Sequence, residues 1–414
     1  MLRYSVLVWS LLMVGVTYRV HVVINRPIPP DIPDQTKVRI LDEIGRLSNH
    51  LLDVFLYFGI PFGAPVQFLV DTTFRCLVGS TRITSHSEDV QVFDHTIHDV
   101  PVRVFKPTRS DRVAHPTLVY IHGGGWTWLT VNSYTAFLTQ LANKTGVVIV
   151  APEYKKVPSY HFPEPYRDCE KVMYQILLGK SGLSVDKYHV MVGGDGSGGN
   201  MAAAVAQKFR KKIFMQVLIS PALQLLDLHI PSYIDNADVI SGITSPRRQI
   251  QKWLLYTGIS TIYTSNLVRN SHAAPEIRHS TISKYVNSEL YFPQYLNITK
   301  RKTSTEYTYD FDSIEKFKDI LTNTTVSPMT QTNLNGVCNA YVVASQYDVL
   351  RDEGIMYAAR LMESEVKAKV KYYPSTFHGF LLFSTEGPFQ LKTGIQALQD
   401  MSDFIRFQLR GYTS

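Results

Sequence analysis

The sequence predicts an α/β fold in which a mostly parallel central sheet is flanked by helices and carries a helical cap. Continuous apolar runs recur along the chain, and a helical pattern follows each of them. Strands buried on both faces of a sheet require such runs, and the intervening helices supply the crossovers between parallel strands. The runs are 117–121, 147–151, 189–193, 214–219 and 340–344.

Two segments that precede these runs have a different pattern. Residues 90–93 and 100–105 alternate apolar and polar side chains at period two, which is typical of half-buried strands. The alternation of strands and helices then stops between about 226 and 320, where aromatic and polar residues mix without a period. We therefore predict one α/β domain over 88–414 that contains a cap insertion at about 226–320.

The N-terminus predicts a membrane anchor at residues 1–25. An uncharged stretch of 15 residues separates Arg3 from Arg19, and apolar residues continue to Ile24. A spanning helix needs roughly 20 residues, and Arg19 could reach the interface with its charged end. No persuasive cleavage site of small residues follows, which favours an uncleaved signal anchor, a single transmembrane helix, over a cleaved signal peptide.

Residues 26–87 are expected to join this anchor to the α/β domain. The first part, 26–36, is rich in proline and predicts a stiff spacer. Residues 37–80 show helical apolar spacing, and we interpret them as N-terminal helices of the cap.

Composition narrows the classes of partner. The net charge is +7, but Lys and Arg are scattered, so we expect a solvated surface and no nucleic-acid partner. Cys76, Cys169 and Cys338 show no C-x-x-C spacing, so no metal site is indicated. The N-x-S/T sequons at Asn143, Asn297 and Asn323 are candidate glycosylation sites, although a few such sites are expected by chance.

A glycine-rich motif follows the first apolar run. Residues 117–121 lead directly into His122-Gly123-Gly124-Gly125-Trp126. Consecutive glycines allow the backbone to approach a ligand and direct N–H groups at it, as the stabilisation of an oxyanion requires. A tight turn would explain the glycines alone equally well, but HGGG in this position is an oxyanion-hole motif of lipases and esterases.

Several further motifs occur in a fixed order. They are the segments 152–158, 162–165, 194–200, 220–222, 347–354 and 377–380, which read PEYKKVP, FPEP, GDGSGGN, SPA, YDVLRDEG and FHGF. In the order and spacing of these motifs the chain resembles the hormone-sensitive-lipase group of the α/β-hydrolase superfamily, and within it the arylacetamide deacetylase-like proteins. The resemblance covers essentially the whole chain.

The resemblance implies an activity and a location. The activity would be hydrolysis of carboxylic esters and arylamides, with a small apolar ester, amide or lipid as ligand and no metal or organic cofactor. The location would be the endoplasmic reticulum membrane, as a single-pass type II glycoprotein with a lumenal catalytic domain.

The resemblance also assigns the site residues, with one departure. The family's nucleophilic serine lies in G-D-S-A-G-G-N, whereas this chain has G-D-G-S-G-G-N, so Gly196 takes the serine's place. Asp348 would be the acid of the triad and His378 the base. The oxyanion hole would comprise His122, Gly123, Gly124, Gly125 and Ser197, with the donors on the last three.

Gly196 leaves three hypotheses open. The chain could be a catalytically impaired hydrolase that survives as an acyl- or lipid-binding pseudoenzyme. It could be an active esterase that uses Ser197 as a displaced nucleophile. Ser197, however, begins a helix, and its side chain points about 100° further round the helix axis than a side chain at position 196 would. Its hydroxyl is more naturally placed to accept from an N–H group of the first helical turn. A structural membrane adaptor is the third hypothesis, and no residue pattern favours it.

Neighbouring residues have simpler interpretations. Asp195 is expected to order the local backbone, and Asp352 and Glu353 to complement a helix dipole. Trp126, Trp128 and the aromatic residues of 253–262 could line an apolar acyl pocket or pack in the core.

Overall fold

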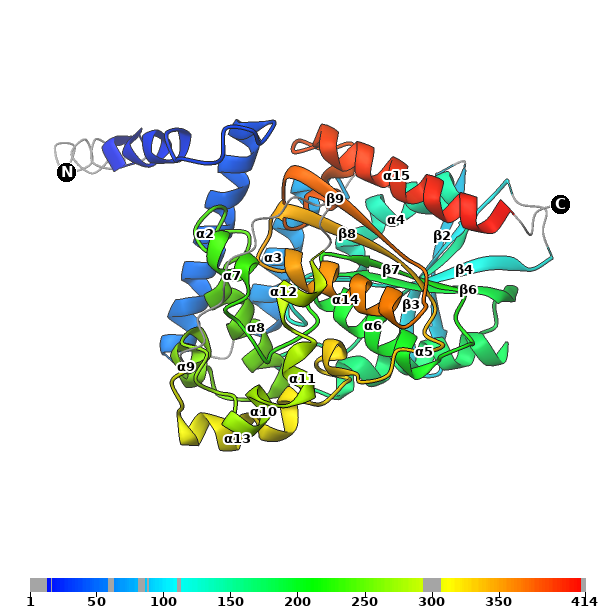
Figure 1. The fold of residues 1–414 in the computed structure, drawn as a ribbon. Coiled ribbons are helices and arrows are strands. Elements are labelled where there is room, and N and C mark those ends of the chain that lie inside the picture. Colours follow the sequence, from blue (N-terminus) through cyan, green and yellow to red (C-terminus); the bar gives the residue numbers. More distant parts are fainter. Residues whose placement is uncertain are drawn as a thin grey trace.

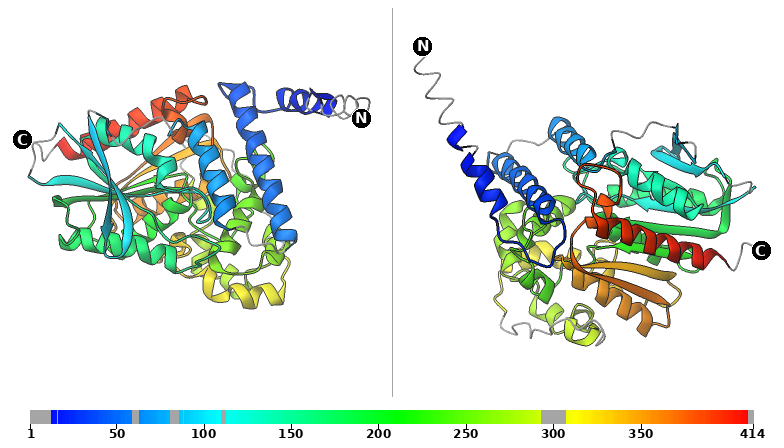
Figure 2. Two further views of the ribbon diagram at one scale, coloured as in Figure 1. Left: turned by 180° about the vertical axis from the view of Figure 1, so that it is seen from behind. Right: turned by 90° about the horizontal axis from the view of Figure 1, so that it is seen from above.

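The computed structural model describes residues 13–15, 17–58, 63–80, 86–87, 89–109, 113–292 and 307–410. Residues 1–12 and 16 of the expected anchor, and the sequon at Asn297, lie outside these ranges. Residues 17–24 are helical and project from the body of the protein (Figures 1 and 2). Within the described ranges, no helix is both long enough and apolar enough to cross a membrane.

The described residues form a nine-stranded sheet in the order β1-β2-β3-β5-β4-β6-β7-β8-β9. The strands β1, β2 and β3 are antiparallel to their neighbours, and all pairs from β5 to β9 are parallel. The predicted α/β fold is therefore confirmed, and the five apolar runs are its central strands. The bounds are His86–Ser87, Val90–Ile97, Val100–Pro107, His115–Ile121, Val148–Pro152, Val185–Asp195, Met215–Ile219, Asn339–Tyr347 and Ala368–Phe377 for β1 to β9.

Helices cover both faces of this sheet, and the pleat of each strand explains why. All seven residues of β4 are buried, with Val119 facing one hydrophobic cluster and Leu118 the other. The first cluster lies under α5, α6 and α14, and the second under α4 and α15 (Figure 1). The bounds are Val131–Thr145 (α4), Glu164–Leu178 (α5), Ser197–Lys208 (α6), Arg351–Glu363 (α14) and Lys392–Leu409 (α15).

Between β7 and β8 the chain leaves the sheet and forms a set of mostly short helices. They are Pro231–Asp235 (α7), Pro246–Thr257 (α8), Thr264–Val268 (α9), Pro275–Arg278 (α10), Thr281–Lys284 (α11), Ser288–Tyr291 (α12) and Phe311–Leu321 (α13). We call this set the cap. Its longest helix, α8, begins with the Ser245 hydroxyl accepting from Arg248 N–H and ends at Gly258 in the left-handed region, both of which are usual helix ends.

Two N-terminal helices, α2 (Gln35–Tyr57) and α3 (Ala64–Leu77), run beside the cap and the sheet (Figure 2). The backbone of α2 touches the cap closely, since a Cβ on Gly45 would lie 2.3 Å from Gly242 O. Asn49 Nδ2 donates to the same carbonyl oxygen at 2.9 Å. The N-terminal helices are thus fixed to the cap by direct backbone contact.

Candidate active site

A sharp turn joins β6 to α6 at Gly196. Its backbone angles are φ 50° and ψ −114°, a region that residues other than glycine enter only under strain. Backbone hydrogen bonds hold the turn: Gly196 N–H donates to Ile219 O, and Gly196 O accepts from the N–H groups of Asn200 and Ala222. A Cβ on Gly198 would lie 2.0 Å from Ile121 O, so α6 begins in direct contact with the end of β4.

The open side of this turn faces His378. A Cβ built on Gly196 would lie 3.6 Å from both Cε1 and Nε2 of the imidazole, at ordinary contact distance. A side chain at position 196 would therefore approach the ring nitrogen that has no hydrogen-bond partner among the described residues.

His378 is paired with Asp348. Nδ1 of the ring lies 2.9 Å from Asp348 Oδ2, while Asp348 Oδ1 accepts from Leu350 N–H at 2.9 Å. Burial would raise the pKa of Asp348, but the charge and hydrogen bond of His378 outweigh burial and lower it. An ionised Asp348 keeps a proton on Nδ1 and leaves Nε2 facing Gly196, which is the orientation of a general base.

The glycine motif forms a loop with unsatisfied N–H groups. Gly124 and Gly125 have φ values of 105° and 66°, which L side chains rarely adopt. Within the described ranges, no acceptor binds the N–H groups of Gly124, Gly125 or Ser197. These three donors are free to stabilise a negatively charged oxygen.

The first two residues of the motif have other partners. Gly123 N–H lies 3.0 Å from Asp195 Oδ1 and 3.0 Å from Tyr134 Oη, so it is not free. The ring of His122 stacks on Tyr154 at 4.4 Å, and its Nδ1 donates to Gly123 O at 2.8 Å. Burial lowers the pKa of His122 to about 4, so the ring is neutral at physiological pH. Both residues shape the loop.

Ser197 faces this loop. Its buried Oγ accepts from Trp126 N–H at 3.2 Å, and no hydrogen bond joins it to His378 in the part of the chain described. The sequence-based expectation that this hydroxyl would accept from an N–H group of the first turn of α6 is therefore wrong, since its donor is Trp126 N–H. The reason is that the loop approaches α6 closely enough to supply a donor of its own.

Asp195 connects the turn to the loop, as expected of an ordering residue. It accepts from Tyr120 Oη at 3.0 Å and Tyr134 Oη at 2.8 Å, in addition to Gly123 N–H. Burial raises the pKa of Asp195, although these hydrogen bonds oppose the shift. No sequence pattern predicts the two tyrosines, because their positions on β4 and α4 become adjacent only in the fold.

Asp352 and Glu353 do more than complement a helix dipole. Both are fully buried in the first turn of α14. Glu353 Oε2 accepts from the N–H groups of Leu223 and Gln224, and its Oε1 accepts from Tyr233 Oη at 3.0 Å. Burial raises the pKa of Glu353 to about 8. The carboxyl group thus attaches the base of the cap beside Asp348.

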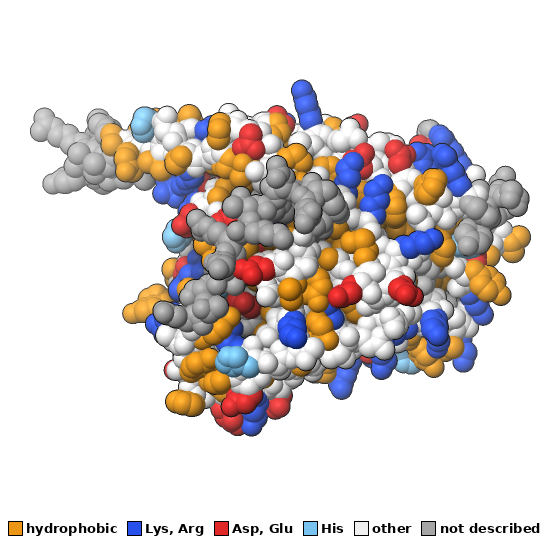
Figure 3. Space-filling view, in the orientation of Figure 1, with side chains coloured by type: hydrophobic (Ala, Val, Ile, Leu, Met, Phe, Trp, Pro, Cys, Tyr) orange, Lys and Arg blue, Asp and Glu red, His pale blue; other side chains and the backbone are white. Residues whose placement is uncertain are grey.

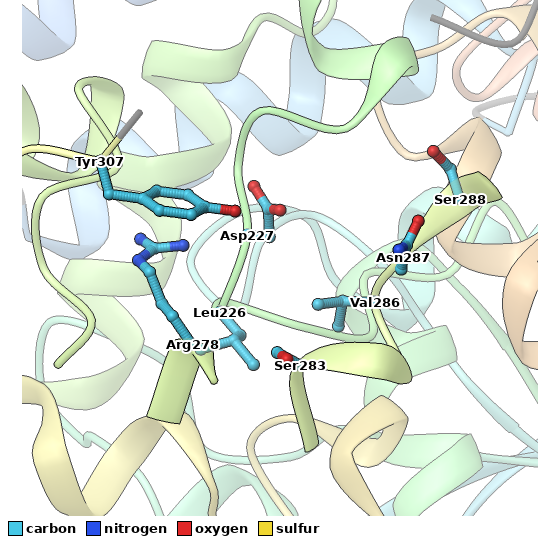
Figure 4. A pocket seen from close by; sticks show the side chains of 8 residues that line it. All are labelled: Leu226, Asp227, Arg278, Ser283, Val286, Asn287, Ser288 and Tyr307. Carbon is cyan, nitrogen blue, oxygen red and sulfur yellow. The ribbon is translucent and has the colours of Figure 1, made fainter. Parts of the chain in front are cut away.

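The aromatic residues near the loop pack on one another. Trp126 stacks on Tyr256 with ring centroids 4.2 Å apart and contacts Trp253 at 4.6 Å. All three side chains are fully buried. A separate cavity of about 160 Å³ lies within the cap (Figure 4). Its lining comprises Leu226, Asp227, Arg278, Ser283, Val286, Asn287, Ser288 and Tyr307, and it includes none of the predicted site residues.

The remaining candidate residues lie elsewhere. Asn143 is exposed on α4, and Asn323 is half-buried after α13. The three cysteines are free thiols, with Cys76 exposed and the other two buried. Within the described ranges, no group of His, Cys, Asp and Glu residues is placed to hold a metal ion.

The site residues lie where strands end, in the chain order of one class of enzyme. In α/β hydrolases a nucleophile turn comes first, then an acid and then a histidine, all at the carboxyl edge of the parallel strands. The chain is built as a member of this class. It matches the model of the α/β hydrolase fold family over residues 118–278 and 292–382, and it belongs to that family.

Similar proteins identify the group within this family to which the chain belongs. Arylacetamide deacetylase of Oryctolagus cuniculus is 32% identical over 77% of this chain and 80% of its own. Neutral cholesterol ester hydrolase 1 of Rattus norvegicus is 28% identical over 95% of this chain and 97% of its own. The chain therefore belongs to the arylacetamide deacetylase-like members of the hormone-sensitive-lipase group, as the motifs predicted.

Solved structures support the same fold. A thermophilic and thermostable carboxylesterase from a metagenomic library has a TM-score of 0.62 at 20% identity, covering 84% of this chain and 98% of its own. A bacterial heroin esterase has a TM-score of 0.61 at 22% identity, covering 83% of this chain and 92% of its own.

Proposed function

We propose that this chain is an ester-, amide- or lipid-binding α/β hydrolase whose serine-dependent hydrolysis is impaired, because residue 196 carries no hydroxyl. One observation carries the proposal: the Cα–Cβ direction at Gly196 points to His378 Nε2 at 3.6 Å, and no oxygen is attached there. A base that has no nucleophile to deprotonate cannot begin acyl transfer.

The other groups have proposed roles that follow from their geometry. His378 would act as the base and Asp348 would orient it, on the support of the 2.9 Å contact. The free N–H groups of Gly124, Gly125 and Ser197 would bind the oxygen of an acyl group. Loss of the serine in a triad enzyme lowers kcat by about a million-fold and leaves roughly 10³–10⁴ over water from binding and the oxyanion hole.

The names of the relatives support the ligand class. Two of them are named for an arylacetamide and for a cholesterol ester, which are an amide and a lipid ester with apolar groups. We therefore propose a small apolar ester, amide or lipid as the ligand.

Ser197 as a displaced nucleophile is the competing hypothesis. Its Oγ would have to leave Trp126 N–H and turn toward His378, which requires the backbone turn itself to move. Labelling with a fluorophosphonate probe tests the two hypotheses. We expect no adduct on the wild-type protein and a strong adduct at residue 196 in Gly196→Ser. An adduct on the wild type that disappears in Ser197→Ala would refute impairment.

We also propose that the N-terminus attaches the protein to the endoplasmic reticulum membrane, with the α/β domain in the lumen. Support comes from exposed apolar side chains on the projecting helix (Figure 3) and on α2. They include Met13, Val14, Tyr18, Val20, Ile24, Leu47, Val54 and Tyr57. Alkaline carbonate extraction of microsomes tests attachment, and a glycosidase shift that becomes smaller in Asn143→Gln tests a lumenal domain.

A further inference from the structure

A lysine of the cap lies over the glycine loop. Lys252 is on α8, and a Cβ built on Gly125 would lie 2.5 Å from its Cδ and 2.8 Å from its Cγ. The alkyl chain therefore crosses the loop at one of the three residues with a free N–H group. Burial and the guanidinium of Arg248 lower the pKa of Lys252 to about 8, while Asp348 acts in the opposite direction. The charge of the amino group therefore interacts with the carboxylate of Asp348, which is paired with His378.

Arg248, the neighbouring cation on α8, has the anionic partner that Lys252 lacks among the described residues. Arg248 lies one helical turn before Lys252, and its guanidinium binds both carboxylate oxygens of Asp53 on α2 and the amide oxygen of Gln251. Lys252, in contrast, forms no ion pair or hydrogen bond with any residue in the described ranges. A half-buried cation without an anionic partner is costly, and a ligand that supplies the negative charge removes that cost.

Among the described residues, several donors of the glycine loop and of α8 have no acceptor. The N–H groups of Gly124, Gly125 and Ser197 have no acceptor, and neither do the buried Trp126 Nε1, Trp253 Nε1 and Tyr256 Oη, in the part of the chain described. A neutral ester offers weak carbonyl acceptors and would leave the lysine charge unpaired. A carboxylate offers two charged oxygens to the same donors.

The missing side chain at 196 makes room for the second of these oxygens. Among the described residues, and apart from its chain neighbours, only His378 has atoms within 4 Å of a Cβ built on Gly196, so a ligand oxygen has room beside the turn. In a working serine hydrolase the nucleophile's hydroxyl fills this space. The same substitution that removes the nucleophile therefore admits an anion.

We propose that the site binds apolar monocarboxylic acids as their carboxylates, in preference to the corresponding esters, with Lys252 as the counter-ion. The proposal deepens the binding function proposed above and rests on it. No covalent step is involved, and the acid leaves as it entered.

Calorimetric titration of the full-length protein in detergent tests this inference. The ligands are laurate and phenylacetate, each paired with its methyl ester as an uncharged control. We expect each acid that binds to do so roughly tenfold or more tightly than its ester, since hydrogen bonds to charged groups contribute more than neutral ones. Lys252→Met, which keeps the apolar chain, should weaken binding of the acid much more than binding of the ester and so reduce that preference.

Matched variants make the outcomes separable. Lys252→Arg keeps the charge and should retain the preference, and Lys180→Met removes an exposed lysine and should change nothing. Thermal unfolding shows whether each variant folds. Equal binding of acid and ester, or equal losses of both in Lys252→Met, overturns this inference while binding itself stands. Failure of all four ligands to bind overturns the proposed function as well.

Discussion

Ser197 Oγ and Trp126 N–H are joined by a hydrogen bond of 3.2 Å across the mouth of the glycine loop. This hydrogen bond gives the Ser197 hydroxyl, next to Gly196, a structural role. It joins the loop to the start of α6, and within the described residues no hydrogen bond joins the oxygen to His378. The serine nearest to the turn thus has a structural partner, and the predictions below separate that role from a catalytic one.

Replacement of Gly196 by serine should create esterase activity. The added Cβ meets His378 at an ordinary contact distance, so the hydroxyl fits. We expect hydrolysis of p-nitrophenyl acetate to rise by about 10⁴-fold or more. The positive φ should lower the free energy of unfolding by about 1–2 kcal/mol. Gly196→Ala is the matched control, because it carries the same backbone strain without the oxygen. Equal activity of the two variants would contradict the assignment of position 196.

Replacement of Ser197 by alanine should affect stability rather than turnover. The change leaves Trp126 N–H without its acceptor in a buried setting, so unfolding should become easier by about 1–2 kcal/mol. Residual esterase activity of the wild-type protein should not change. Chemical denaturation and ester hydrolysis measure the two effects. A fall in activity that exceeds the loss of folded protein would restore Ser197 as a nucleophile.

Asp348→Asn should silence the Gly196→Ser variant. The amide retains an acceptor for Leu350 N–H, but its NH₂ group forces the proton of His378 onto Nε2, where a base needs a lone pair. We expect kcat to fall by about 10⁴-fold, as the equivalent change does in serine proteases. Asp403→Asn on α15 is the control and should keep full activity. Retention of activity in both would show that Asp348 does not orient the base.

Glu353 should make the protein less stable as the pH rises. Its pKa is 4.5 in the ordinary state and about 8 in the fold, so the folded protein binds the extra proton between these values. The contribution of Glu353 is therefore fully present below pH 4.5 and is lost as the pH rises to about 8.

Glu353→Gln removes this titration and keeps a neutral group of similar shape. Thermal unfolding between pH 5 and 8 should show a smaller decline with pH than the wild-type protein. Glu386→Gln, at an exposed position, should follow the wild type. An unchanged pH dependence in Glu353→Gln would place the proton on another group.

The sheet could be predicted because its signal is local. Each central strand is a short apolar run, and both faces of β4 are buried as its uninterrupted apolar residues require. The turn at Gly196 could be located for a similar reason, since close backbone contacts demand its flanking glycines, such as Gly198. Order along the chain then places the acid and the histidine at neighbouring strand ends.

The remaining contacts depend on how the cap folds. Lys252 is an ordinary helical lysine in the sequence, and only the position of α8 brings it over Gly125. Glu353 looks like a residue at the start of a helix, and only the return of the chain at Leu223 and Gln224 buries it. No pattern in the chain encodes these approaches, because they join elements far apart in sequence.

The backbone bonds that hold Gly196 use only its N–H and carbonyl groups. These hydrogen bonds therefore do not depend on the side chain at position 196, so a substitution there can remove the nucleophile and leave the bonds of the turn in place. Ligand binding and chemical reactivity are then separable properties, and substitution at this one position is enough to change reactivity.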